Sequence, residues 1–119
     1  TFMRHSDLLS FEEIARLAQA ARSGKAARDE LSGSTITLTS LGALGGIVST
    51  PVLNLPEVAI VGVNRIVERP MVIKGQIVIR KMMNLSSSFD HRVVDGMDAA
   101  QFIQAIRGLL EQPATLFVE

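Results

Sequence analysis

The spacing of apolar residues predicts one helix near each end of the chain. A capping box of Ser10 and Glu13 begins the first helix, and apolar residues recur every three or four positions until Ser23–Gly24 ends it. The second helix follows Met97 and stops at Pro113. Its apolar stripe consists of Phe102, Ile103, Ile106, Leu109 and Leu110.

Between these helices, the residue pattern predicts several strands. Residues 34–39 alternate Ile and Leu with Thr, which is typical of a half-buried strand with a hydroxyl face. Residues 58–63 are continuously apolar, as in a central strand that is covered on both faces. Residues 83–90 form a further strand, and one of its faces carries Asn84, Ser86, Ser88 and Asp90.

Residues 66–80 carry the signal of a hairpin. Lys74–Gly75 forms the turn before a strand at residues 76–80. Arg69–Pro70 interrupts the preceding apolar residues, and proline cannot donate to a sheet ladder, so we expect an edge or a bend there. The order of helix, strands and helix predicts a single α+β or α/β domain over residues 1–119, with a mixed β-sheet flanked by helices.

Composition narrows the classes of protein. The chain has 119 residues, 47% of them hydrophobic, and its 12 basic residues balance 12 acidic ones. Without a basic face, nucleic acid is not an expected partner. No apolar run approaches the roughly 20 residues that a membrane span requires, and the N-terminus lacks the pattern of a signal peptide. The absence of cysteine suits a reducing compartment, and we expect a cytoplasmic location.

Residues 86–96, SSSFDHRVVDG, hold the main candidate for chemistry. His91 stands between a predicted strand and a predicted helix, and histidine exchanges protons near neutral pH. The alternative is a histidine that lies in a turn with its polar atoms hydrogen-bonded and has no chemical role. Asp95 either orients this loop or caps the final helix, and both roles are compatible.

Other candidates carry weaker signals. The hydroxyl of Thr39, at the end of a predicted strand, is a candidate donor to an oxyanion, but from spacing alone ordinary β-branched strand composition is the much better explanation. The glycine-rich residues 42–46 lack the Lys-Ser/Thr of a phosphate-binding loop, which favours a turn with positive φ. His5 and His91 without cysteine do not make a zinc site, so we expect no metal.

Two motifs together resemble a known family. Residues 89–96, FDHRVVDG, resemble the DHRxxDG signature of the dihydrolipoamide acyltransferases, the E2 cores of the 2-oxo acid dehydrogenase complexes. The broader His-x-x-x-Asp-Gly pattern also occurs in chloramphenicol acetyltransferase and in peptide-synthetase condensation domains. Residues 37–60, with TLTSLG, GG, TP, Asn54 and PEVAI, are similar to the E2 pattern at matching spacing. The resemblance runs from Arg4 to Glu119.

The resemblance implies an acyl transfer between a dihydrolipoyl arm and coenzyme A. His91 matches the catalytic base, Thr39 the donor to the tetrahedral oxyanion, and Asp95 a supporting position. Coenzyme A is then a substrate, the lipoyl group belongs to a domain absent from residues 1–119, and no metal is required. The implied fold is like that of chloramphenicol acetyltransferase, of which this chain is the C-terminal half.

The resemblance also implies an assembly. E2 cores form trimers whose active sites lie between subunits, with the counterparts of His91 and Thr39 on neighbouring chains. The trimers build a cubic or dodecahedral core, and the E1 and E3 subunits bind through domains absent here. The missing half is expected to supply part of the fold and part of the coenzyme A site.

The resemblance also indicates which acyl group is transferred. MMNLSSSFDHRVVDG and LLEQPATLFVE most resemble bacterial branched-chain E2 enzymes, with the acetyltransferase of pyruvate dehydrogenase as the alternative and succinyl transfer disfavoured. An inactive, core-forming fragment is an alternative of another class. The PEVAI and LTSLG segments disfavour an antibiotic acetyltransferase.

Overall fold

A computed structural model describes residues 11–117. Its main sheet has the order β1 (Thr37–Ser40), β2 (Ala59–Val63), β5 (Leu85–Phe89), and β3 (Val67–Ile73) pairs with β4 (Gln76–Met82) in a separate two-stranded sheet. The helices are α1 (Phe11–Arg22) and α2 (Gly96–Glu111), with short 3-10 turns η1 (Asp29–Leu31), η2 (Gly42–Leu44) and η3 (Pro113–Phe117). The main sheet is mixed, because β1 is parallel to β2 and β5 is antiparallel to it. The expected α+β class with a mixed sheet is confirmed.

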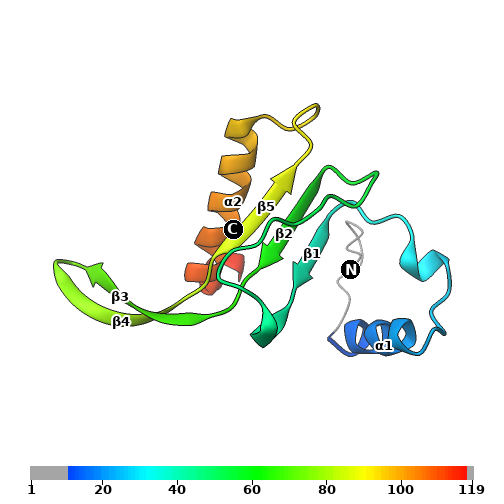
Figure 1. Ribbon diagram of the computed structural model, residues 1–119, viewed down its shortest axis with the longest axis horizontal. Coiled ribbons are helices and arrows are strands. Elements are labelled where there is room, and N and C mark those ends of the chain that lie inside the picture. The colour runs from blue at the N-terminus through cyan, green and yellow to red at the C-terminus, as the bar shows by residue number, and fades with distance from the viewer. Residues whose placement is uncertain (1–10, 118–119) are drawn as a thin grey trace.

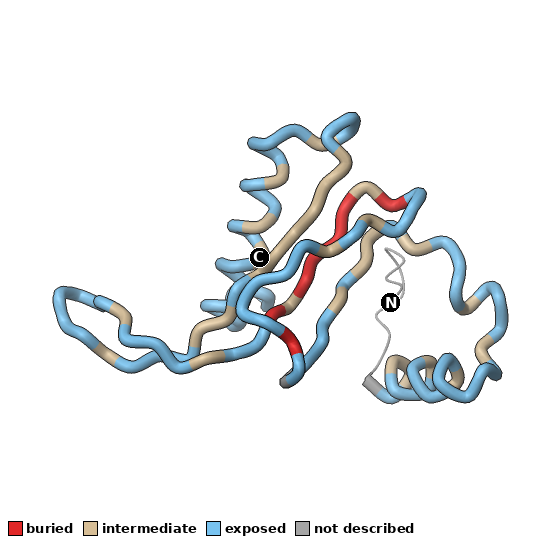
Figure 2. The backbone as a smooth tube through the Cα atoms, in the orientation of Figure 1, coloured by how far each residue is buried: buried red, intermediate tan, exposed pale blue. Residues whose placement is uncertain are grey.

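The buried centre of the described region lies on β2. Figure 2 shows the buried segment running through this strand, and Ala59, Ile60 and Val61 are 9%, 5% and 3% exposed. Backbone pairing on both sides and a continuously apolar sequence explain this burial. The prediction of a central strand at residues 58–63 is therefore confirmed, one residue shorter at its start.

The first strand differs from its prediction in length and in the face that is covered. β1 begins at Thr37 rather than at residue 34. Thr37 and Thr39 are half-buried, whereas Leu38 is 63% exposed, so the hydroxyl face is the covered one. The threonine face lies beneath the chain around Ser49, while the described residues leave Leu38 largely uncovered.

The β3–β4 hairpin extends away from the main sheet (Figure 1). Its turn at Lys74–Gly75 is as predicted, with φ of 51° and 79°, which matches the geometry that suits the twist of a hairpin. The expected edge at Arg69–Pro70 is confirmed, because β3 belongs to a two-stranded sheet. The expected bend is not found, since β3 runs through both residues and Pro70 stands opposite Ile79. A two-stranded sheet tolerates proline because each strand has one unpaired edge.

The ends of α1 and α2 follow from their sequences. α1 stops at Arg22, Gly24 has φ of 68°, and the Lys25 N–H donates to the Ala20 carbonyl at 2.9 Å, as in a left-handed C-cap. The predicted N-cap at Ser10 lies outside the described residues. At α2, the Asp95 carboxylate accepts a hydrogen bond from the Asp98 N–H at 2.8 Å, which confirms the predicted cap.

α2 lies against one face of the main sheet beside β5 (Figure 1). Phe102 of α2 meets Phe89 of β5 edge to face, with 6.2 Å between ring centroids and 89° between ring planes. Ile103 and Ile106 are half-buried on the same helix. This packing places the turn that contains His91 between two fixed elements. Among the described residues, no helix is both long and apolar enough to span a membrane.

We predict that Asp95→Ala destabilises the full-length protein by about 1 kcal/mol, because the first turn of α2 loses its side-chain acceptor. Urea unfolding measures the change. Asp95→Asn is the control, since its side-chain oxygen also caps a helix and should retain most of the stability. Equal destabilisation by both substitutions would contradict the capping role.

Candidate functional site

Three residues form a row across the main sheet. Thr39 of β1 stands opposite Gly62 of β2, and Gly62 stands opposite Ser86 of β5. Gly62 is buried and has no side chain to fill the space between its neighbours. A Cβ there would come within 3.0 Å of the Ser49 Oγ, 3.3 Å of the Ser86 carbonyl oxygen and 3.7 Å of the Thr39 Cγ2. The row is therefore open because residue 62 is glycine.

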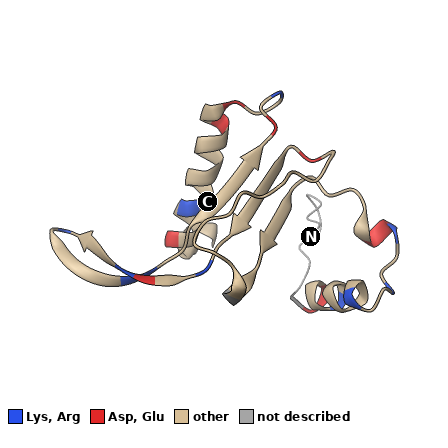
Figure 3. Cartoon of the chain, in the orientation of Figure 1, with Lys and Arg blue, Asp and Glu red and all other residues tan. Residues whose placement is uncertain are grey.

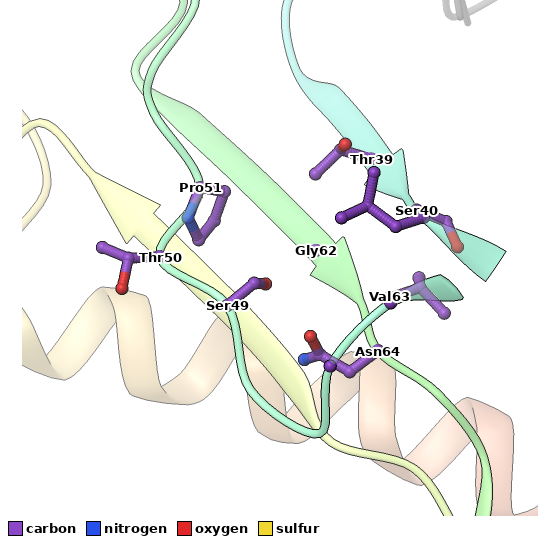
Figure 4. A pocket seen from close by; sticks show the side chains of 11 residues that line it. Thr39, Ser40, Ser49, Thr50, Pro51, Gly62, Val63 and Asn64 are labelled. Atoms are coloured by element: carbon purple, nitrogen blue, oxygen red, sulfur yellow. The ribbon is translucent and has the colours of Figure 1, made fainter. Parts of the chain in front are cut away.

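A cavity of about 210 Å³ lies over this row (Figure 4). One water occupies about 30 Å³ of liquid volume, so the space is sufficient for a small organic group. Thr39 and Gly62 contribute from the strands, Asn64 follows the end of β2, and Ser49 to Pro51 form the opposite wall. The full lining is Thr39, Ser40, Leu41, Gly45, Gly46, Ser49, Thr50, Pro51, Gly62, Val63 and Asn64.

The cavity is neutral and carries several hydroxyl groups. β1, β2 and β5 contain no Lys, Arg, Asp or Glu, and Figure 3 shows charged residues on the surrounding loops, helices and hairpin instead. A neutral polar lining is suited to the uncharged part of a ligand. A strongly charged part of the same ligand needs contacts elsewhere.

The side chain of Asn64 fixes one end of the cavity. Asn64 is 7% exposed, and its Nδ2 donates to the Asn84 carbonyl at 3.0 Å and to the Ser86 Oγ at 2.9 Å. A carbonyl oxygen only accepts hydrogen bonds, so the amide nitrogen must face Asn84. The orientation of the carboxamide follows from these two contacts.

The backbone around His91 is organised by Asp90. The Asp90 N–H donates to the Val58 carbonyl at 2.9 Å, and the Asp90 carbonyl accepts from the N–H groups of Val93 and Val94 at 3.0 Å each. The Asp90 carboxylate accepts from the Arg92 N–H at 3.1 Å and from the Arg92 guanidinium at 2.6 Å. His91 is exposed on the turn that these contacts hold.

Arg92 changes the acidity of Asp90. Hydrogen bonds from the guanidinium of Arg92, with further help from the Arg92 N–H, lower the pKa of Asp90 from 3.8 to about 2. The Asp90 side chain is 13% exposed, whereas that of Arg92 is 82% exposed. Asp90 therefore stays ionised across the physiological range and keeps the turn in place.

The structure does not bring His91 and Thr39 together within one chain. Thr39 shares its row with Ser86, whereas His91 follows Phe89 at the far end of β5. Three residues along β5, from Ser86 to Phe89, and two strand spacings across the sheet place the end of β5, which His91 follows by two residues, roughly 10 Å from Thr39 in each direction. Asp95 is near His91 in the chain, and its carboxylate contacts the first turn of α2.

A buried carboxylate anchors the start of β1. Glu57 is 4% exposed, and its two oxygens accept hydrogen bonds from the hydroxyls of Ser34 and Thr37. These hydrogen bonds, that of Ser34 first, lower the pKa of Glu57. Because Thr37 precedes Thr39 by two residues on the same face of β1, Glu57 helps to set the position of Thr39.

Other predicted positions have plainer outcomes. Gly42 has φ of 56°, so the prediction of a positive-φ turn in the glycine-rich loop is confirmed. His5 lies outside the described residues. Within residues 11–117, no three histidine or acidic side chains are grouped so that they could hold a metal ion.

Residues 3–118 match the family model described as 2-oxoacid dehydrogenases acyltransferase (catalytic domain). Over 107 residues, the chain is 86% identical to the lipoamide acyltransferase component of the branched-chain alpha-keto acid dehydrogenase complex of Pseudomonas putida. This match covers 90% of the chain and 25% of that protein, so the chain spans about a quarter of the length of this relative.

Two solved structures are similar in fold. The dihydrolipoamide acetyltransferase (E2p) of Azotobacter vinelandii, studied for the catalytic roles of a serine, a histidine and an asparagine, has a TM-score of 0.84 and 39% identity. The cubic core of the pyruvate dehydrogenase multienzyme complex has a TM-score of 0.84 and 40% identity. Each match covers 90% of this chain and 44% of the other chain.

We predict that Arg92→Gln weakens the dependence of stability on pH in acid. A carboxyl whose pKa is lowered on folding stabilises the protein fully above its ordinary pKa of 3.8, and this contribution is lost as the pH falls toward about 2. The substitution removes the guanidinium, so the variant should lose less stability than the wild type over that interval. Urea midpoints at a series of pH values in full-length protein measure this loss.

Arg80→Gln is the control, because Arg80 has no ion pair within residues 11–117. It should leave the pH dependence as in the wild type. The assignment fails if the wild type and Arg92→Gln lose the same stability between pH 3.8 and pH 2.

Proposed function

Because this chain belongs to the 2-oxoacid dehydrogenase acyltransferase catalytic-domain family, we propose that the protein moves an acyl group between a dihydrolipoyl arm and coenzyme A. The observation that carries the proposal is the open cavity lined by Thr39, the residue at which the family resemblance places the oxyanion donor. A neutral cavity fits the thioester end of an acyl donor. The phosphates of coenzyme A need cations that β1, β2 and β5 lack.

The spacing of the candidate residues supports their roles. In the Azotobacter vinelandii acetyltransferase, the histidine follows the serine by 52 residues and precedes the asparagine by 4. Thr39, His91 and Asp95 have the same spacings in this chain. Thr39 keeps the hydroxyl of serine, and Asp95 keeps a side-chain oxygen that caps α2.

In the proposed reaction, a ring nitrogen of His91 takes the proton from the attacking thiol, since the thiolate is the nucleophile. The sulfur adds to the thioester carbonyl, and the hydroxyl of Thr39 donates to the oxyanion that forms. Collapse of this intermediate breaks the original carbon–sulfur bond, and His91 returns its proton to the departing thiolate. Asp95 fixes the end of the histidine turn and takes no part in proton transfer.

The separation of Thr39 from His91 supports a site shared between copies of the chain. Each copy carries Thr39 at one end of the main sheet and His91 at the other end. In the proposed assembly, a second copy brings its His91 to the first copy's Thr39. We propose a trimer that contributes to a larger core, by analogy with the cubic core of the similar pyruvate dehydrogenase structure. Partner E1 and E3 subunits and a cytoplasmic location belong to the same proposal.

Exposed apolar side chains support the proposal that residues 1–119 are the C-terminal half of a catalytic domain. Leu44, Val52 and Ile77 are 97%, 84% and 78% exposed among the described residues. Surfaces of this kind are normally covered by another part of the protein or by another chain. The chain also covers 44% of each similar solved chain. Lipoyl and subunit-binding domains are proposed to lie outside these residues.

The same surfaces favour a second candidate, namely that these residues by themselves form a core-building piece without activity. Transfer by the full-length protein but not by residues 1–119 would identify the chain as a structural part of the enzyme. For the acyl group, we propose a branched chain, because the Pseudomonas putida relative with this specificity in its name is 86% identical. Comparing isobutyryl-CoA with acetyl-CoA as donors to dihydrolipoamide separates this from the acetyl alternative.

We predict that His91→Ala lowers kcat by roughly 100- to 10,000-fold, because the general base is lost. Transfer from isobutyryl-CoA to dihydrolipoamide by the full-length protein is the assay. The control is His5→Ala, which removes the second histidine of residues 1–119 and should leave kcat unchanged. Normal kcat in His91→Ala would overturn the assignment.

Thr39→Ala should lower kcat by roughly 100- to 1,000-fold, since the developing oxyanion loses its donor. Thr39→Ser keeps a hydroxyl at the same position and should retain most of the rate. Stopped-flow or steady-state measurement of kcat for both variants tests the role. If both substitutions have the same effect, the hydroxyl is not the important feature of residue 39.

A site shared between copies predicts complementation. His91→Ala and Thr39→Ala subunits, mixed under conditions that exchange subunits, should recover about one quarter of the wild-type rate, because a heterologous interface then pairs intact halves at random. Each variant treated alone is the control. Failure to recover any activity, with mixed assemblies verified by mass spectrometry, would place both groups in one copy.

A further inference from the structure

Residues 47–51 contain the cavity wall at Ser49 to Pro51, and side chains attach this segment to β5 and to Asn84 just before it. The Asn84 Nδ2 donates to the Ile47 carbonyl at 2.9 Å, and the Ser88 Oγ donates to the Pro51 carbonyl at 2.6 Å. Between them, the Ser49 N–H donates to the Ser86 Oγ at 3.2 Å. The contacts therefore recur at every second residue of both segments.

The position of the wall explains why side chains make these bonds. β5 already uses its backbone to pair with β2, and residues 47–51 lie over the face of the sheet, with the Ser49 Oγ close to Gly62. Only side chains that point out of this face can reach them. Alternate residues of a strand share a face, so Asn84, Ser86 and Ser88 are all directed toward the wall.

Ser86 is the central contact of this ladder. Its Oγ accepts from the Ser49 N–H in the wall and from the Asn64 Nδ2 at the end of β2. Ser49 and Asn64 both line the cavity. One hydroxyl therefore connects two sides of the cavity, and Ser86 also stands in the row that contains Thr39.

We propose that Asn84, Ser86 and Ser88 are positioning residues that set the distance between the cavity wall and Thr39, and thereby decide which acyl donors fit. This proposal rests on the acyl transfer proposed above. The three residues act through residues 47–51 and do not touch the reacting atoms. Thr39 itself is held by the pairing of β1 with β2, so loosening the wall alters the fit of the donor more than the position of the hydroxyl.

Three consecutive serines provide a matched set of variants. Ser86 and Ser88 face the wall, whereas Ser87 lies on the opposite face and makes no side-chain hydrogen bond within residues 11–117. Ser86→Ala and Ser88→Ala remove ladder contacts, and Ser87→Ala removes the same atom from the same strand without affecting the ladder. Ser86→Thr keeps the hydroxyl and tests for rescue.

The experiment measures amide hydrogen exchange and kinetics on the full-length protein. Exchange of the peptide covering residues 46–52 should rise in Ser86→Ala by about fivefold, the effect of one lost hydrogen bond, and stay at the wild-type rate in Ser87→Ala. KM for isobutyryl-CoA should rise by a similar factor in Ser86→Ala and Ser88→Ala, with a smaller change in kcat. Their preference for isobutyryl-CoA over acetyl-CoA, as the ratio of kcat/KM values, should differ from that of the wild type.

The proposal is overturned if Ser86→Ala exchanges like Ser87→Ala, or if Ser86→Ala and Ser88→Ala both keep the wild-type ratio of kcat/KM for the two donors. A fall in stability with that ratio unchanged would show a merely structural role. Recovery of both exchange and KM in Ser86→Thr is the supporting result. A wild-type protein that transfers neither acyl group overturns the proposed function and the specificity role together, while the exchange data still decide whether Ser86 holds the wall.

Discussion

The missing side chain at Gly62 is the constraint on which the candidate site depends. Gly62 lies on the central strand of the main sheet, between Thr39 and Ser86, and a Cβ there would press against the Ser49 Oγ and the Ser86 carbonyl. Glycine usually weakens a strand because it offers nothing to pack. Here the empty space allows residues 47–51 to approach the sheet while a cavity remains beside Thr39.

Side-chain hydrogen bonds hold the segments around this space together. Buried polar groups need partners, and β5 pairs its backbone with β2 in the plane of the sheet, so side chains bind the segment that lies over the face of the sheet. Asn64 and Ser86 connect the wall to the strands, and Glu57 secures the start of β1. These neutral or fully hydrogen-bonded contacts keep ionised groups out of the cavity, which suits a thioester better than a charged ligand.

The histidine turn is built by different interactions. Asp90 holds it by backbone bonds to Val58 and Val94 and by an ion pair with Arg92, and Asp95 links its end to α2. The turn and the cavity lie at opposite ends of the same antiparallel pair of strands. This separation is the observation behind the proposed site shared between copies, and the exposed apolar surfaces agree with a covering by other chain segments.

Several features follow from local sequence. The stop of α1 at Gly24, the cap at Asp95, the turn at Lys74–Gly75 and the burial of β2 depend on neighbouring residues or on a run of apolar ones. The two motifs likewise identify His91 and Thr39 as candidates, although their catalytic roles stay predictions. At Pro70 the sequence left an edge and a bend as alternatives, and the pairing of β3 with β4 alone decided for the edge.

By itself, therefore, the sequence determined the elements, the family and the candidate residues. Only the tertiary structure decided that the threonine face of β1 is the covered one, that Glu57 anchors this strand, and that Ser86 joins β5 to a wall 37 residues away in the chain. The alternation of Asn84, Ser86 and Ser88 was visible as a pattern, but its partner was not. Hydrogen bonds between distant segments depend on how strands are ordered in space, and residue spacing within one segment carries no information about that order.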